Sequence, residues 1–187
     1  MHNIHIVVRK LLYIGLCCLL PKFVWAQELK PTVYYMNLPE VSQVAKDIHS
    51  GRITPSDNAP IYTIADSMST DNNKTRPFYI FLVSKMLLNS QDEKLKDNLG
   101  AYCRRIMQNK PDPVVTLLFS KSVKPEYKDE WAKAIAKEIA ANCDKSLIEC
   151  FKSTRLLSLE VSNNANKDKV EAMFNVVRSN LNLQRHQ

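Results

Sequence analysis

From residue 39 onward, apolar residues recur every three or four positions, which is the spacing of one face of an α-helix. The pattern predicts about eight helices, in segments 39–49, 60–68, 77–88, 91–109, 113–119, 125–141, 144–151 and 170–181. Segment 77–88 is apolar nearly all round, so we expect it to be central and buried. The short run VVTLLF at 114–119 does not by itself separate helix from strand.

Short polar signals mark where several of these helices begin. Ser90 and Glu93 have the spacing of a capping box, and Asp144 can cap the helix that follows it. Gly100 lies inside a predicted helix, where glycine costs about 1 kcal/mol relative to alanine. We therefore expect a neighbouring helix to pack closely at Gly100.

Glycine is scarce: only Gly51 and Gly100 occur after residue 26, and the chain has no Asn-Gly or Asp-Gly pair. Tight β-hairpins usually need such residues. The sequence therefore predicts an all-α protein with a single multi-helix domain, built either as an irregular bundle or as stacked helical hairpins. Segment 27–37 has no helical stripe.

The N-terminus has a different pattern. Arg9 and Lys10 precede ten uncharged apolar residues, 11–20, and Val24 and Ala26 are compact residues of the kind that signal peptidase accepts. Ten residues fall well short of the roughly 20 needed to span a bilayer. We expect a secretory signal peptide over residues 1–26, cleaved between Ala26 and Gln27. The remaining chain, 27–187, would be a periplasmic or secreted domain without a transmembrane segment.

Removal of such a signal changes the charge. The full chain carries a formal charge of +7, and 27–187 keeps 23 Lys and Arg against 19 Asp and Glu, which leaves +4. This mild excess gives no reason to expect a nucleic-acid partner. The lysine-rich helix 125–141 is interleaved with acids, and Asp129 and Lys133 have the spacing of an ion pair. A solvated helix face is favoured there, with association to a membrane surface as an alternative.

Candidate metal ligands are few. After residue 26 the only cysteines and histidines are Cys103, Cys143, Cys150, His49 and His186, and they show no zinc-type spacing. We expect no metal centre and no cofactor. A thiol enzyme or small hydrolase would have to use Cys103 or Cys150 with His49, together with Asp47 or Asp66.

A disulfide is the favoured use of the cysteines, because an exported domain meets oxidants. Cys143 and Cys150 would lie roughly 10 Å apart within one continuous helix, whereas a disulfide needs Cα atoms within about 7 Å. The two can pair only if Cys143 precedes the helix. We favour this pair; a bond from Cys103 to either partner and three buried thiols are the alternatives.

No Gly-rich phosphate loop or serine elbow occurs. Asn73-Lys74-Thr75 has the form of a glycosylation sequon, and whether it is used stays open. The chain therefore offers no coherent catalytic set. We expect an exported, non-enzymatic α-helical protein that binds another protein in the cell envelope or outside the cell, in the manner of an immunity protein or an adaptor. Its oligomeric state stays open.

Overall fold

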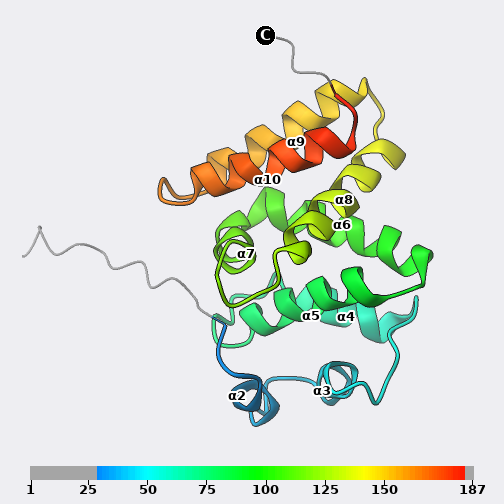
Figure 1. Cartoon of the computed structure of the whole chain (residues 1–187), viewed down its shortest axis with the longest axis vertical. Coiled ribbons are helices and arrows are strands. Elements are labelled where there is room, and N and C mark those ends of the chain that lie inside the picture. Colours follow the sequence, from blue (N-terminus) through cyan, green and yellow to red (C-terminus); the bar gives the residue numbers. More distant parts are fainter. Residues whose placement is uncertain (1–28, 184–187) are drawn as a thin grey trace, which may run out of the picture.

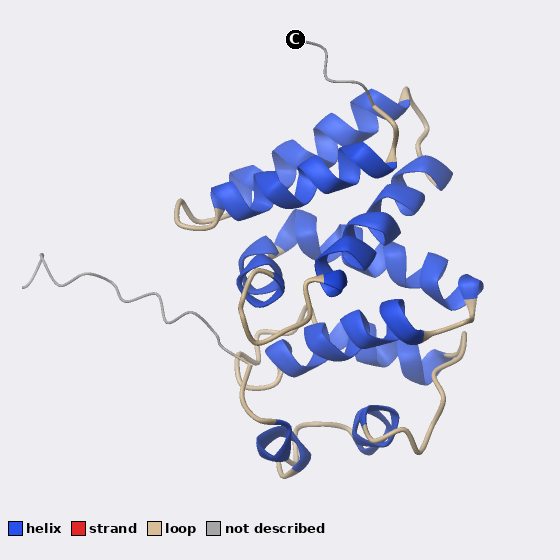
Figure 2. Ribbon diagram, in the orientation of Figure 1, coloured by secondary structure: helices blue, strands red, loops and turns tan. Residues whose placement is uncertain are grey.

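Helices and the loops between them make up all of residues 29–183, the part of the chain that the computed structural model describes (Figure 2). No strand occurs in this range, which confirms the all-α prediction. The predicted signal peptide and its cleavage site at Ala26 and Gln27 lie outside the described residues. The helices are α2 (Thr32–Met36), α3 (Gln43–His49), α4 (Ala59–Ser67), α5 (Arg76–Asn89), α6 (Glu93–Asn109), α7 (Pro111–Leu118), α8 (Glu126–Ala141), α9 (Leu147–Val161) and α10 (Lys167–Asn180).

The helices form layers that follow the order of the chain. Figure 1 shows α2 and α3 at one end, α4 and α5 next, α6 to α8 in the middle, and the α9–α10 hairpin at the other end. Helices that pack against each other are never more than three positions apart in the order of helices along the chain. The fold therefore combines the two predicted arrangements: it is one packed domain, and its helices are stacked in chain order.

Helix α8 lies at the centre and packs against α5, α6, α9 and α10. Its buried residues include Trp131 and Ile135. Within the core, the indole Nε1 of Trp131 donates a hydrogen bond to the hydroxyl of Ser84 at 2.7 Å, and that hydroxyl donates to the carbonyl of Ile80. The polar group of the largest buried side chain is thus satisfied without solvent.

Two short segments whose secondary structure the sequence pattern did not predict are helical. The run VVTLLF belongs to α7, a buried helix that starts at Pro111, a residue whose fixed φ suits the first turn. Segment 27–37 contains the five-residue helix α2, which has no periodic stripe because it is little more than one turn long. Tyr35 anchors α2 by stacking on Phe78 of α5, with ring centroids 5.0 Å apart.

The predicted caps of α6 and α9 were wrong by two residues. Asp92 caps α6 by accepting from the amide of Leu95, while Ser90 ends α5 and its hydroxyl accepts from the amide of Asp92. At α9 the capping box is formed by Ser146 and Glu149, not by Asp144. In both cases the linker is longer than the sequence signal implied, so the next residue of a capping type, Asp92 or Ser146, takes the cap.

The expected close approach at Gly100 is confirmed. A Cβ atom at this position would lie only 2.7 Å from the carbonyl oxygen of Ala134 on α8 and 3.3 Å from the Cβ of Glu138. Because the nearest atom belongs to the backbone of α8, a side chain could be accommodated only if the two helices moved apart.

We expect Gly100→Ala to lower the free energy of unfolding by about 1–3 kcal/mol through overpacking. Alanine in an unobstructed helix would instead raise it by about 1 kcal/mol. Denaturant unfolding followed by circular dichroism measures the difference. Ala101→Ser, at the exposed neighbouring position, should change the value by no more than about 0.5 kcal/mol. A Gly100→Ala variant more stable than the parent protein would contradict the close contact.

Candidate functional site

The predicted disulfide is present. Cys143 lies in the turn after α8, before α9 begins, and is bonded to Cys150 within α9, with the two Cα atoms 6.0 Å apart. This placement of Cys143 is the one that the geometry required. The bond joins the end of α8 to the first turns of α9, so it fixes where α9 leaves the central layer. Cys103 is the free cysteine within the described chain, and it is buried on α6.

The residues expected of a thiol enzyme are buried or bound to other partners. Cys150 is held in the disulfide, and burial raises the pKa of the Cys103 thiol, so the nucleophilic thiolate is disfavoured. Asp47 hydrogen-bonds to Arg52 and Gln43, and Asp66 pairs with Arg105 at 2.6 Å. Each aspartate therefore has a partner other than a cysteine or histidine.

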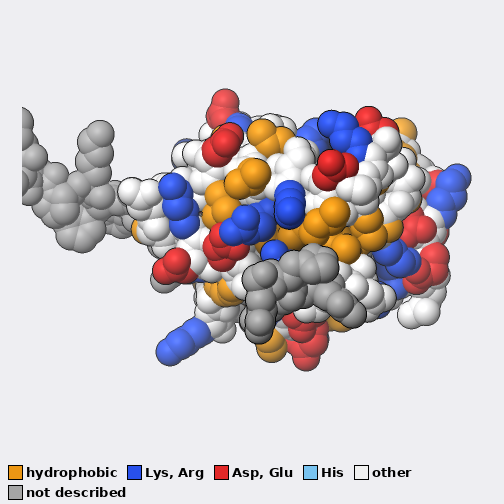
Figure 3. Space-filling view, turned by 90° about the horizontal axis from the view of Figure 1, so that it is seen from above, with side chains coloured by type: hydrophobic (Ala, Val, Ile, Leu, Met, Phe, Trp, Pro, Cys, Tyr) orange, Lys and Arg blue, Asp and Glu red, His pale blue; other side chains and the backbone are white. Residues whose placement is uncertain are grey.

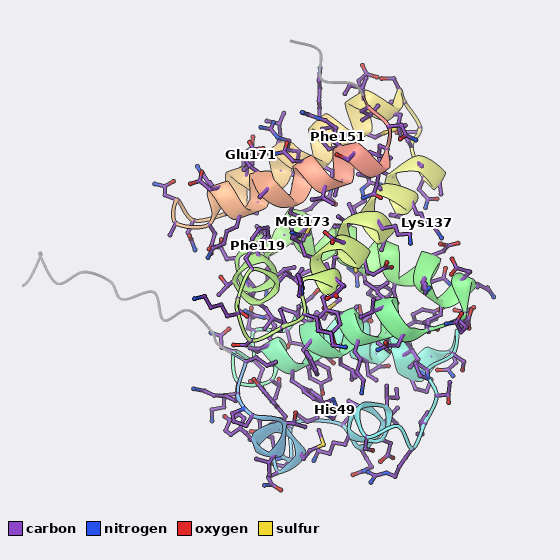
Figure 4. All side chains as sticks on the ribbon, in the orientation of Figure 1. His49, Phe119, Lys137, Phe151, Glu171 and Met173 are labelled. Carbon is purple, nitrogen blue, oxygen red and sulfur yellow. A yellow bond between two sulfur atoms is a disulfide. The ribbon has the colours of Figure 1, made fainter. Side chains whose placement is uncertain are left out.

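His49 ends α3 and packs against aromatic side chains of α5. Its ring centroid lies 5.5 Å from that of Phe78 and 5.8 Å from that of Phe81 (Figure 4). The pKa of His49 is lowered below its usual 6.5, mainly by burial of the ring and to a smaller extent by the positive charge of Lys85. The neutral ring is therefore favoured, although His49 lies at the C-terminus of α3, where the helix dipole favours a charged histidine.

The lysine-rich helix is α8, and its lysines are paired with acids. Lys137 contacts Glu93 at 2.9 Å and Asp97 at 3.1 Å, and the bond to Lys137 is the main reason that the pKa of Glu93 falls to about 2. The predicted Asp129–Lys133 pair is replaced by Glu130 and Lys133, 3.5 Å apart and one residue closer in sequence. The apolar stripe of α8 is buried in the core.

The most unusual surface of the described chain lies on α9. Leu156, Leu157 and Val161 expose 51%, 43% and 50% of their surface, whereas the other large hydrophobic residues with comparable exposure are Val33, Tyr34 and Ile53 in the N-terminal layer. Half of these exposed residues thus gather within six positions of one helix. We call Leu156, Leu157 and Val161 the α9 face.

The packing of α9 explains this exposure. Its opposite side is buried against α6, α8 and α10 through residues that include Phe151 and Thr154, so the α9 face points outward. Arg155 pairs with Glu171 across the α9–α10 hairpin, and Arg178 covers the ring of Phe151 (Figure 4). Seen from above, this end of the molecule carries hydrophobic side chains between charged side chains of both signs (Figure 3).

The α9 face was not foreseen from the sequence. The stripe that predicts this helix, Leu147, Ile148 and Phe151, says nothing of the apolar residues that follow it. The extra signal is the run Leu156-Leu157-Ser158-Leu159, which holds more apolar residues than one buried stripe needs. A surface of this kind offers apolar contact area and no group that could carry out acid–base or nucleophilic chemistry.

Comparisons with protein-family models, with curated proteins and with solved structures find no significant match to this chain. Within residues 29–183, no helix is both long enough and apolar enough to cross a membrane.

The sequon residue Asn73 is exposed in the loop before α5, and Thr75 is buried at the start of that helix.

We expect the double substitution Cys143→Ser/Cys150→Ser to lower the free energy of unfolding by about 2–3 kcal/mol, the entropic value for a closed loop of this length. Denaturant unfolding in the absence of reductant measures the loss. Adding a reductant should destabilise the parent protein by a similar amount and leave the double variant unchanged. An equal effect of reductant on both proteins would contradict the assignment of the pair.

The lowered pKa of His49 predicts a pH dependence of stability. As the pH falls through about 6.5, the unfolded chain binds a proton that the folded chain does not, so the free energy of unfolding should decrease. His49→Phe should flatten this decrease between about pH 7.5 and 5.5, above the range in which carboxylates titrate. His186→Gln, at a position outside the described residues, is the control, and its free energy of unfolding should still decrease over this pH range. An unchanged pH profile in His49→Phe would show that another group is responsible.

Proposed function

We propose that this protein is an exported, non-enzymatic binding protein that docks another protein of the cell envelope or the surroundings through the α9 face. The observation that carries the proposal is the gathering of Leu156, Leu157 and Val161 on one exposed stretch of a helix that is held in place on its other side. Exposed apolar clusters of this kind are typical of surfaces that another protein covers.

The partner that fits this surface is a protein with an apolar patch of its own. The α9 face lies along a rigid helix, and such a face is suited to contact with a second helix or a shallow apolar groove. Its immediate neighbours carry both signs of charge, Lys152 and Glu160 among them, so the contact should depend more on apolar area than on salt.

The compartment belongs to the same proposal. The N-terminal pattern of residues 1–26 is that of a secretory signal, and the Cys143–Cys150 disulfide suits a compartment that contains oxidants. The narrower versions of the proposal are an immunity protein that neutralises a toxin and an adaptor that joins two envelope proteins. The immunity version predicts that cells lacking the protein become sensitive to that toxin.

A membrane-surface role for α8 is less well supported. Interfacial helices bind lipid through an exposed apolar side, whereas the apolar residues of α8 lie in the core and its lysines are paired with carboxylates.

The test is capture of the partner from envelope extract or culture supernatant with residues 27–187, followed by mass spectrometry. A single dominant partner that stays bound at high salt is expected. The variant Leu156→Ser/Leu157→Ser/Val161→Ser should reduce its recovery at least tenfold, because removal of the central apolar contacts of an interface typically has that effect.

Val33→Ser/Ile53→Ser is the matched control, since it removes exposed apolar side chains from the opposite end of the molecule. It should bind the partner as the parent protein does. Equal loss in both variants, or full binding by the α9 variant, would contradict the assignment of the surface.

A further inference from the structure

A cavity of about 350 Å³ opens between α3, the loop after it and the C-terminal half of α5. The floor of the cavity is apolar and consists of Ile48, Leu82 and Met86, all of them buried. Small-molecule sites commonly have volumes of about 300–1,000 Å³ and combine apolar walls with a few polar groups. The polar groups here are Thr54, Ser56, Lys85, Asn89, Ser90, Gln91 and Asp92.

Two charged residues, Asp92 and Lys85, line this cavity. They differ in how many hydrogen bonds they already form within the protein. The carboxylate of Asp92 accepts hydrogen bonds from the backbone amides of Leu95 and Asp57, one on each oxygen. Lys85 donates a single bond, 2.8 Å long, to the carbonyl of His49. Its ammonium group has three donors, so two remain for another acceptor.

Within the described residues, no carboxylate lies close enough to Lys85 to form an ion pair with it. Lys85 belongs to none of the ion pairs formed within residues 29–183; the lysines that do form them are Lys94, Lys96, Lys110, Lys128, Lys133 and Lys137. The cavity therefore contains one cation with free donors beside an apolar floor. A ligand that complements both features carries an anionic head and an apolar chain.

We propose that this cavity binds a small monocarboxylate with an apolar chain, with the carboxylate at Lys85 and the chain over Ile48, Leu82 and Met86. A single negative charge is favoured over a double one because the carboxylate of Asp92 lines the same cavity and repels added charge. This site is separate from the α9 face, which lies at the other end of the molecule (Figure 1), and it would operate whether or not a protein docks there.

The experiment is a titration of octanoate into ¹⁵N-labelled residues 27–187, followed by two-dimensional NMR. Saturable shifts should appear at the amides of Lys85, Met86 and Asn89. Lys85→Met removes the charge and keeps an apolar stem, so it should weaken binding about tenfold, whereas Lys85→Arg should retain binding. Octylammonium and octyl phosphate should bind more weakly than octanoate.

The matched control is Lys46→Met. Lys46 is a half-buried lysine of α3 that donates to the carbonyl of Leu38 at 2.9 Å, as Lys85 does to His49, but it does not line the cavity. The control should bind octanoate like the parent protein. Three results would overturn the proposal: no saturable shift, equal binding of octylammonium, or shifts confined to α9. If Lys85→Met does not fold, the proposal is still tested by the Lys85→Arg variant and by the comparison of octanoate with octylammonium and octyl phosphate.

Discussion

The arrangement of the domain depends on how closely α6 and α8 approach each other at Gly100. Because a side chain there would collide with the backbone of Ala134, only glycine allows the two axes to lie at this distance. The contact places α8 where α5, α6, α9 and α10 can all reach it. The cost of a glycine within a helix, about 1 kcal/mol, is thus offset by the packing of the central layer.

The position of α8 in turn determines what α9 exposes. The Cys143–Cys150 bond begins two residues after α8 ends and limits the directions in which α9 can leave. With one side of α9 packed on the central layer and on α10, Leu156, Leu157 and Val161 remain outside. A rigid helix that presents apolar side chains loses little conformational entropy when another protein covers it, which favours docking at this surface.

Much of this architecture is predictable from the sequence because it depends on local periodicity. The stripes of eight helices, the close helix contact at Gly100 and the pairing of Cys143 with Cys150 follow from spacing and simple geometry. Features that depend on the packing of distant segments are not predictable in this way. Which side of α9 is buried is decided by where α6, α8 and α10 lie. The cavity beside Lys85 becomes apparent only when the loop after α3 is placed beside α5.

The central claim is that a protein partner covers the α9 face. Site-specific photocrosslinking tests it most directly, with a photoreactive amino acid placed at Leu157 and, in a second protein, at Val33. Both proteins would be irradiated in envelope extract of the producing cells. The account predicts a discrete crosslinked product from position 157 and none from position 33. No product at position 157, or the same products from both positions, would contradict it.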